Sequence, residues 1–348
     1  MFYNLNADWY DIDLETSTRC NAACPMCFRN LSGDRVNPNL QITDFDIDWL
    51  DNIDLPLRTV SLCGNYGDPI ISNNLHDIVE KVLSKKFVEG KKVIIMTNGG
   101  ARTPEWWKEL AKIMRHGDNC RVIFGIDGLE DTNHLYRRNV EWHKLMENVK
   151  AFIGAGGRAQ WKMLLFKHNQ HQVEEAKQKS IDMGFVLFET ILTNRFKNVK
   201  QKSVYPVYNK LGEHIYDLEE AKIADKDFTP RKKARQEQVW SGKVNCYANK
   251  LNSIYMAADG RVYPCPNTGY VANKGQETIL EVNQYATDNN IADMKLSQII
   301  KGDFFTAVKQ SHNIKGLCMP TCIRTCGKKR DNLLNTQRIG KNAKLLQA

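Results

Sequence analysis

Apolar runs typical of β-strands alternate with amphipathic segments through the first 190 residues, and this alternation constrains the fold more than any other feature. The strand-like runs span residues 9–14, 58–62, 92–96, 121–126, 160–166 and 185–190. Amphipathic segments fill the gaps at residues 44–53, 75–84, 104–116, 141–153 and 172–183. Because strands that alternate with helices form parallel sheets, the pattern predicts an α/β architecture, with the sheet open or closed into a barrel.

The pattern changes after residue 190. Residues 194–243 are polar and basic and contain Pro206 and Pro230, so we expect connecting loops and short helices there. Further on, the runs 251–257 and 261–264 flank the turn Ala258-Asp259-Gly260, which predicts a β-hairpin because Asp-Gly supplies the positive φ of a tight turn. We expect four parts: a core barrel over 1–195, a basic linker over 196–243, a cysteine-rich domain over 244–330 and a basic tail over 331–348.

The net charge of +9 is unevenly distributed. Residues 195–243 hold 12 basic and 7 acidic side chains, and residues 309–348 hold 9 basic and 1 acidic, so the remainder of the chain is slightly acidic. A solvated surface is the commoner role of such segments. The distribution weakens the case for a nucleic-acid partner and leaves docking of an acidic protein as the simpler use of the charge.

The chain has neither a membrane-spanning run of about 18–20 apolar residues nor an N-terminal basic region followed by an apolar stretch. We therefore expect no membrane association and a cytoplasmic location. In that reducing compartment, the ten cysteines are expected to serve as metal ligands or thiols rather than as disulfides.

Three cysteines, Cys20, Cys24 and Cys27, lie within eight residues directly after the first predicted strand. Three thiolates on a short loop suit one face of a metal cluster and leave a coordination position open, as a catalytic centre needs. A structural zinc site would need a fourth ligand, which the neighbouring sequence does not supply. The triplet therefore favours a cluster.

Polar or glycine-containing segments follow five successive predicted strands, at residues 20–27, 63–69, 97–99, 125–128 and 167–169. The carboxyl ends of parallel strands share one edge of a sheet, and α/β proteins build their sites at that edge. Glycines there let the backbone approach a ligand closely. The sequence thus predicts one site assembled from all five segments.

The Cys-x3-Cys-x2-Cys spacing resembles the signature of radical S-adenosylmethionine (SAM) enzymes. The resemblance implies a partial (β/α)6 TIM-like barrel and a [4Fe–4S] cluster on Cys20, Cys24 and Cys27, with the amino and carboxylate groups of SAM on the fourth iron. The later segments resemble that family's SAM-contacting motifs, although Asn65-Tyr66-Gly67-Asp68 stands where Gly-Gly-Glu is usual. They imply SAM-binding roles for nine residues: Gly64, Asn65, Tyr66, Gly67, Asp68, Thr97, Asn98, Asp127 and Arg138.

A second group of cysteines comprises Cys246, Cys265, Cys318, Cys322 and Cys326. It resembles the SPASM or shorter twitch extension of radical SAM enzymes, a small cysteine-rich domain of a β-hairpin with helix and loops that carries auxiliary iron–sulfur clusters. A full SPASM pattern has seven cysteines. We therefore expect one auxiliary [4Fe–4S] cluster, with one spare thiol or an open, substrate-facing position. Two clusters with non-cysteine ligands remain an alternative, as does a zinc ribbon.

The resemblance implies an oxidoreductase that cleaves SAM reductively to a 5′-deoxyadenosyl radical and abstracts a hydrogen atom from a peptide or small molecule. The outcome would be peptide modification, or dehydrogenation or rearrangement of a small molecule, with an electron donor of the flavodoxin or ferredoxin type. No residue stands out as a catalytic acid or base. Two alternatives stay open: an iron–sulfur sensor or scaffold without turnover, and a zinc-containing nucleic-acid-binding protein.

Overall fold

The computed structural model describes residues 2–3, 7–31, 35–38, 40–193, 195–198, 203–222, 244–273, 289–312, 314 and 318–327. The expected basic tail over 331–348 and residues 199–202 and 223–243 of the expected linker lie outside these ranges. Within them, no helix is both long and apolar enough to cross a lipid bilayer.

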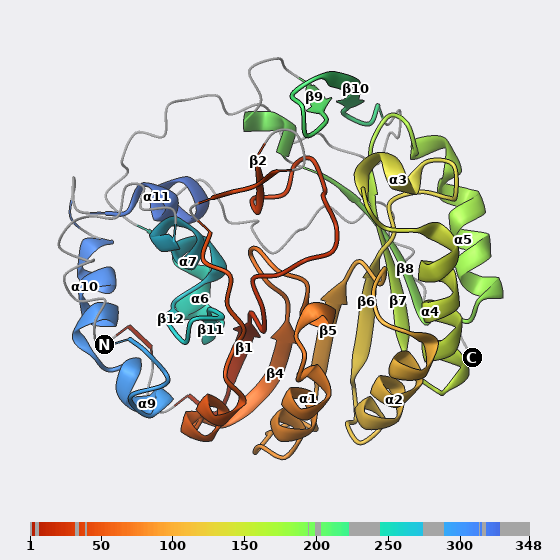
Figure 1. The fold of residues 1–348 in the computed structure, drawn as a ribbon. Coiled ribbons are helices and arrows are strands. Elements are labelled where there is room, and N and C mark those ends of the chain that lie inside the picture. The colour runs from red at the N-terminus through yellow and green to blue at the C-terminus, as the bar shows by residue number, and fades with distance from the viewer. Residues whose placement is uncertain are drawn as a thin grey trace.

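An eight-stranded sheet in the order β12-β11-β1-β4-β5-β6-β7-β8 forms the body of the molecule (Figure 1). Its parallel strands are β1 (Tyr10–Leu14), β4 (Leu57–Leu62), β5 (Val93–Thr97), β6 (Arg121–Gly125), β7 (Ala159–Leu165), β8 (Leu187–Leu192) and β11 (Ser253–Met256). The first six confirm the strands expected from the sequence. The molecule has an α/β fold with a mixed, mainly parallel sheet.

The predicted hairpin is confirmed, because β12 (Val262–Tyr263) pairs antiparallel with β11. The hairpin does not stand in a sheet of its own. β11 pairs in parallel with β1, so the cysteine-rich C-terminal region extends the same sheet from its first strand. The division of the chain at residues 243 and 244 stays a prediction.

Helices α1 (Leu75–Leu83), α2 (Pro104–Met114), α4 (Trp142–Gly154) and α5 (Val173–Asp182) confirm four of the amphipathic segments. They lie along the outside of the sheet in Figure 1. The sheet side chains of one face are fully buried, among them Ile12, Val60, Ile95, Phe124 and Trp161. This apolar layer holds the sheet rigid beneath the edge where the strands end.

The remaining helical elements among the described residues are short or lie in the C-terminal region. They are α3 (Asn133–Tyr136), α6 (Tyr247–Lys250), α7 (Pro266–Asn273), α9 (Leu296–Ile299), α10 (Asp303–Ser311), α11 (Pro320–Cys326) and the 3-10 helices η1 (Ile47–Asn52), η2 (Pro69–Ile71), η3 (Gln170–Gln172) and η4 (Arg195–Asn198). A small ribbon pairs β2 (Asn30–Leu31) with β3 (Arg35–Val36).

Two expectations from the sequence need correction. The amphipathic segment 44–53 forms only the short 3-10 helix η1, because its first residues are held extended: Asp44 bridges to Ser17, and Phe45 N–H donates to Thr16 O at 3.0 Å. Residues expected as loops and short helices after 194 contain η4, but also an antiparallel hairpin of β9 (Val204–Tyr208) and β10 (His214–Glu219). Valine and tyrosine favour strands, and Pro206 is tolerated because each strand of a two-stranded ribbon is an edge.

The opposite face of the sheet is half-exposed and carries polar side chains. The strand register places Asp13, Ser61, Cys63, Lys162 and Glu189 on this polar face. Burial raises the pKa of the Cys63 thiol to about 12, with Asp13 adding to the increase and Lys162 opposing it. Cys120 is buried, as expected of a core thiol, whereas Cys63 lies half-buried on the polar face.

Burial also raises the pKa of Asp13 from 3.8 to about 6, which makes folding less favourable wherever this carboxyl must ionise. Relative to the ionised form, the protonated Asp13 carboxyl favours the folded state. This contribution to stability is fully present below the unfolded pKa of 3.8 and is lost as pH rises through about 6. We predict that Asp13→Asn increases the free energy of unfolding, relative to the wild type, by about 2 kcal/mol more at pH 8 than at pH 4. Urea denaturation at both pH values measures this, and a pH-independent difference would contradict the prediction.

Candidate functional site

The loop that follows β1 leaves the carboxyl edge of the sheet (Figure 1) and contains Cys20, Cys24 and Cys27. All three are free thiols; Cys24 is buried and the other two are half-buried. The loop is closed by Cys27 N–H, which donates to Cys24 O at 3.1 Å, and is tied to the segment after α3 by Ala23 N–H, which donates to Arg138 O at 2.9 Å. The predicted triplet is therefore held in one compact loop.

Nitrogen donors point at two of the three sulfurs. Cys20 Sγ accepts from Ala22 N–H at 3.4 Å and from the Asn98 amide at 3.7 Å, and Cys24 Sγ accepts from Arg137 Nη1 at 3.9 Å. Burial raises the pKa of Cys24 to about 11, against the influence of Arg137, and it raises the pKa of Cys20 as well.

This donor set fits an iron–sulfur cluster, because iron deprotonates a thiol outright and hydrogen bonds to ligand sulfurs are part of such sites. In the part of the chain that the structure describes, no three His, Cys, Asp or Glu side chains come close enough together to hold a single metal ion.

Gly64 and Gly67, in the loop after β4, lie so close to neighbouring atoms that a larger side chain would clash with them. A Cβ on Gly64 would lie 2.5 Å from Glu15 Oε1, and one on Gly67 would lie 1.7 Å from Ser17 O. Glu15 Oε1 accepts from Tyr66 N–H at 2.7 Å and from Gly67 N–H at 3.1 Å. Sequence analysis missed Glu15, although it directly follows the first predicted strand at the edge where the site residues gather.

Asp68 and Asn98 come together beside the cysteine loop. Asp68 is buried, and its Oδ2 accepts from Asn98 N–H at 2.7 Å and from the Asn98 amide at 2.6 Å. The same amide donates to Asn21 Oδ1 at 2.9 Å, and Thr97 Oγ1 accepts from Gly99 N–H at 3.0 Å. Asp68 thus orients Asn98 toward the cysteines.

Asn65 and Asp127, two further predicted SAM contacts, use their polar atoms in contacts away from the cysteine sulfurs. Asn65 donates to Pro266 O at 2.9 Å, in the C-terminal region, and Tyr66 is buried. Asp127 is completely buried; its Oδ1 accepts from Leu164 N–H at 2.6 Å and its Oδ2 lies 2.7 Å from Arg137 Nε.

Of the adjacent arginines Arg137 and Arg138, it is Arg137 whose guanidinium donates to a cysteine sulfur of the loop. Arg138 donates through Nη1 to Tyr208 O at 3.2 Å, whereas Arg137 lies between Asp127 and Cys24. Burial acts to lower the pKa of Arg137, but Asp127 and Cys24 together hold it above its usual value. Two adjacent arginines follow α3, and the sequence pattern does not distinguish which one turns inward.

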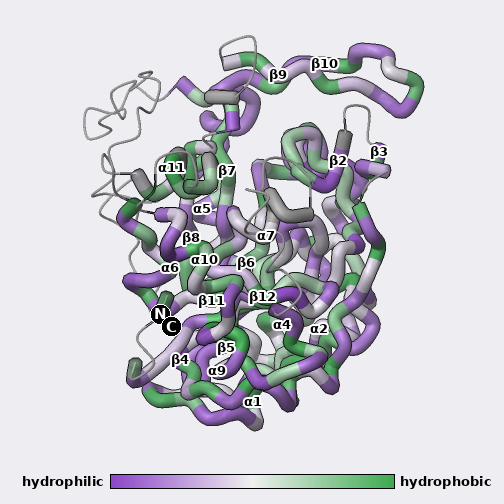
Figure 2. Tube along the Cα trace, turned by 90° about the vertical axis from the view of Figure 1, so that its left-hand side faces the viewer, coloured by the Kyte–Doolittle hydropathy of each residue, from purple (hydrophilic) through white to green (hydrophobic). Residues whose placement is uncertain are grey.

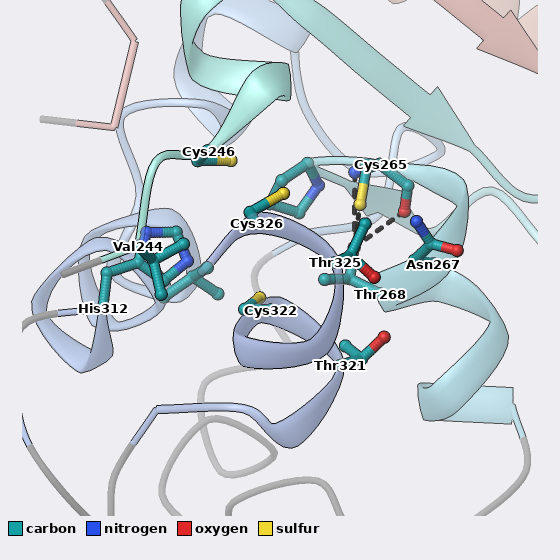
Figure 3. A pocket seen from close by; sticks show the side chains of 12 residues that line it. Val244, Cys246, Cys265, Asn267, Thr268, His312, Thr321, Cys322, Thr325 and Cys326 are labelled. Carbon is teal, nitrogen blue, oxygen red and sulfur yellow. Dashed lines mark hydrogen bonds between the residues drawn. The ribbon is translucent and has the colours of Figure 1, made fainter. Parts of the chain in front are cut away.

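Four of the five C-terminal cysteines line one cavity, as Figure 3 shows. Cys246 precedes α6, Cys265 follows β12, and Cys322 and Cys326 lie on α11. Cys318 is buried nearby against Met319 and does not line the cavity.

His312, which the sequence did not single out, lies at the same cavity. Burial lowers its pKa to about 4, and its Nε2 has no hydrogen-bond partner among the described residues. Its only sequence signal is its position at the end of an amphipathic helix.

The β9–β10 hairpin projects at the top of the molecule in Figure 2 and contacts the cysteine loop. Tyr205 OH donates to Pro25 O at 2.9 Å, and Tyr216 OH donates to Leu135 O at 2.7 Å. Arg195 donates to Met26 O and, at 3.1 Å, to Tyr136 OH. The segment expected to be a linker therefore holds the cysteine loop and α3 together.

Comparison with known proteins identifies the domain. The family model of the radical SAM superfamily matches residues 14–179, and no curated protein matches the sequence. The structure resembles SuiB of Streptococcus suis bound to S-adenosylmethionine, with 15% identity over 91% of this chain and 72% of SuiB and a TM-score of 0.57.

Two peptide-bound structures are also similar. SuiB bound to the precursor peptide SuiA has 13% identity over 87% of this chain and 67% of SuiB, with a TM-score of 0.54. Native anSMEcpe with bound AdoMet and the Cp18Cys peptide has 14% identity over 92% of this chain and 91% of anSMEcpe, with a TM-score of 0.52. At these identities the similarity shows a shared fold.

The family implies a [4Fe–4S] cluster and SAM, and the cysteine loop at the carboxyl edge of the sheet lies inside the matched residues. Residues 14–179 are therefore a radical SAM domain.

Proposed function

We propose that this enzyme cleaves SAM reductively and uses the resulting radical to abstract a hydrogen atom from its substrate. Cys20, Cys24 and Cys27 hold the catalytic [4Fe–4S] cluster in this proposal. The observation that carries it is the arrangement of the three thiols on one loop with nitrogen donors directed at the sulfurs of Cys20 and Cys24. When bound, such a cluster supplies the electron that splits SAM into methionine and a 5′-deoxyadenosyl radical.

The chain's own residues bind and orient SAM beside that loop. Gly64 and Gly67 let the loop after β4 pack closely against Glu15 and Ser17, and Asp68 fixes the Asn98 amide at the same edge. We assign the SAM site to the segments 64–68 and 97–98, and we assign Asp127 and Arg138 a supporting role, since their polar atoms hold Arg137 and the cysteine loop. Positioning of reactants is the protein's main contribution in cofactor enzymes.

We propose the polar face of the sheet as the substrate surface and a peptide as the substrate class, with a small molecule as the alternative. The polar face ends at the same edge as the cysteine loop. It presents an acidic side chain, Asp13, and a basic one, Lys162, to a substrate. The peptide-bound structures of SuiB and anSMEcpe support this choice.

We further propose that Cys246, Cys265, Cys322 and Cys326 hold one auxiliary [4Fe–4S] cluster, which aids substrate oxidation or binding. Their shared cavity supports this ligand set. The electron donor in this proposal is an acidic flavodoxin- or ferredoxin-type protein that docks on the basic segments of the sequence.

We predict that anaerobically reconstituted wild-type protein, reduced in the presence of SAM, releases 5′-deoxyadenosine, and that Cys24→Ala releases none because the cluster loses a ligand. Product chromatography measures both. Cys120→Ala, which alters a buried thiol outside the site, is the matched control and should retain activity. Cleavage by Cys24→Ala would refute the assignment of the loop, iron binding without cleavage by the wild type would favour a sensor, and zinc without iron would favour the zinc-protein alternative.

We predict that the two neighbouring cysteines Cys318 and Cys322 differ in iron binding. Wild-type protein should contain about eight irons per chain, four for each cluster. Cys322→Ala should contain about four, because it loses a cavity-lining thiol, whereas Cys318→Ala should keep about eight. Iron analysis of the reconstituted proteins tests this; equal losses in both variants would show that the cavity does not define the ligand set.

A further inference from the structure

A buried ion pair stands directly behind one of the three cysteines of the catalytic loop. Asp127 is 0% exposed, and its Oδ2 lies 2.7 Å from Arg137 Nε. On its other side, Arg137 Nη1 donates to Cys24 Sγ at 3.9 Å. The positive charge of the guanidinium is therefore held between a fixed carboxylate and a thiol.

The surroundings are shaped to keep the guanidinium in this place. A Cβ on Gly125 would lie 2.3 Å from Arg137 Nη2, so the end of β6 needs glycine to admit the arginine. Asp127 is fixed by Leu164 N–H at 2.6 Å and, through its own N–H, by Asn133 Oδ1 at 2.9 Å. These contacts come from separate elements and hold the ion pair from both sides.

The stability of the fold does not explain why a buried ion pair stands at this position. The desolvation of two buried charges offsets much of their attraction, and replacing a buried ion pair by apolar residues is often neutral or stabilising. A cation beside a cluster ligand, in contrast, has a direct electrostatic effect: it favours the more negative, reduced state of the cluster, and burial strengthens that effect.

We propose that Arg137 is a positioning residue that raises the reduction potential of the catalytic cluster through its contact with Cys24, while Asp127 holds it in place and moderates its charge. This inference rests on the proposed function, since it requires a cluster on Cys20, Cys24 and Cys27. Arg138, whose guanidinium is directed to Tyr208 O, has no such effect.

The test is a redox titration of the anaerobically reconstituted holoenzyme with dithionite. The electron paramagnetic resonance signal that is present in the wild type and absent from Cys24→Ala is assigned to the cluster on the cysteine loop. The titration follows this signal. Arg137→Met should make reduction about tenfold less favourable, a shift of about 59 mV to lower potential for a one-electron couple. The reduction potential of Arg137→Lys should lie between those of the wild type and Arg137→Met, because lysine keeps the positive charge but lacks the planar guanidinium. Arg158→Met, which alters an exposed arginine outside the site, is the control and should titrate like the wild type.

Asp127→Asn separates this role from a merely structural one. Removing the negative charge behind Arg137 should raise the potential, opposite to Arg137→Met, whereas a general loosening of the loop would move both variants in the same direction. The double variant Asp127→Asn/Arg137→Met leaves no unpaired buried charge, and its potential should lie between those of the wild type and Arg137→Met. Iron content confirms that each variant is loaded.

Two results would overturn the inference. An unchanged potential in fully loaded Arg137→Met, or a fall in both single variants, would remove the electrostatic role and leave the proposed function intact. A wild-type signal identical to that of Cys24→Ala would show that no cluster sits on this loop, and the proposed function would fail together with the inference.

Discussion

The buried carboxylate of Glu15 joins the three parts of the molecule that the site depends on. It lies at the end of β1, where Oε1 accepts from Tyr66 and Gly67 of the loop after β4, and Oε2 accepts from Tyr255 OH of β11 at 2.5 Å. Burial raises its pKa, against these hydrogen bonds. Without this carboxylate, the three donors would lose this acceptor, and losing a hydrogen-bond partner is costly for a buried group. Glu15 therefore ties the end of β1, which leads into the cysteine loop, to the loop after β4 and to β11 of the C-terminal region.

Buried carboxylates also position hydrogen-bond donors at the cysteines. Two of the three thiols are contacted by a nitrogen donor that a buried carboxylate holds: Asp68 holds Asn98 against Cys20, and Asp127 holds Arg137 against Cys24. Each carboxylate comes from a segment that follows a strand of the sheet. The rigid apolar layer under α1, α2, α4 and α5 fixes the strand ends, and through them the donors at the sulfurs.

The sequence predicted the regular features well, because strand and helix periodicity and cysteine spacing are local signals. It identified the six strands of the core, the β11–β12 hairpin and both cysteine groups. It could not show that Arg137 rather than Arg138 turns inward, that Glu15 is an anchor, or that Cys318 lies outside the cavity, because these depend on contacts between distant segments. The β9–β10 hairpin was missed because Pro206 and the surrounding charge are typical of loops.

In the proposed function, Cys20, Cys24 and Cys27 bind a cluster with one iron open to SAM. Electron paramagnetic resonance of the reduced, reconstituted protein, recorded with and without SAM, tests it most directly. SAM should change the signal of one cluster in the wild type, and Cys24→Ala should have no signal that responds to SAM. A reduced wild-type spectrum that SAM leaves unchanged would show that no cluster on this loop binds SAM.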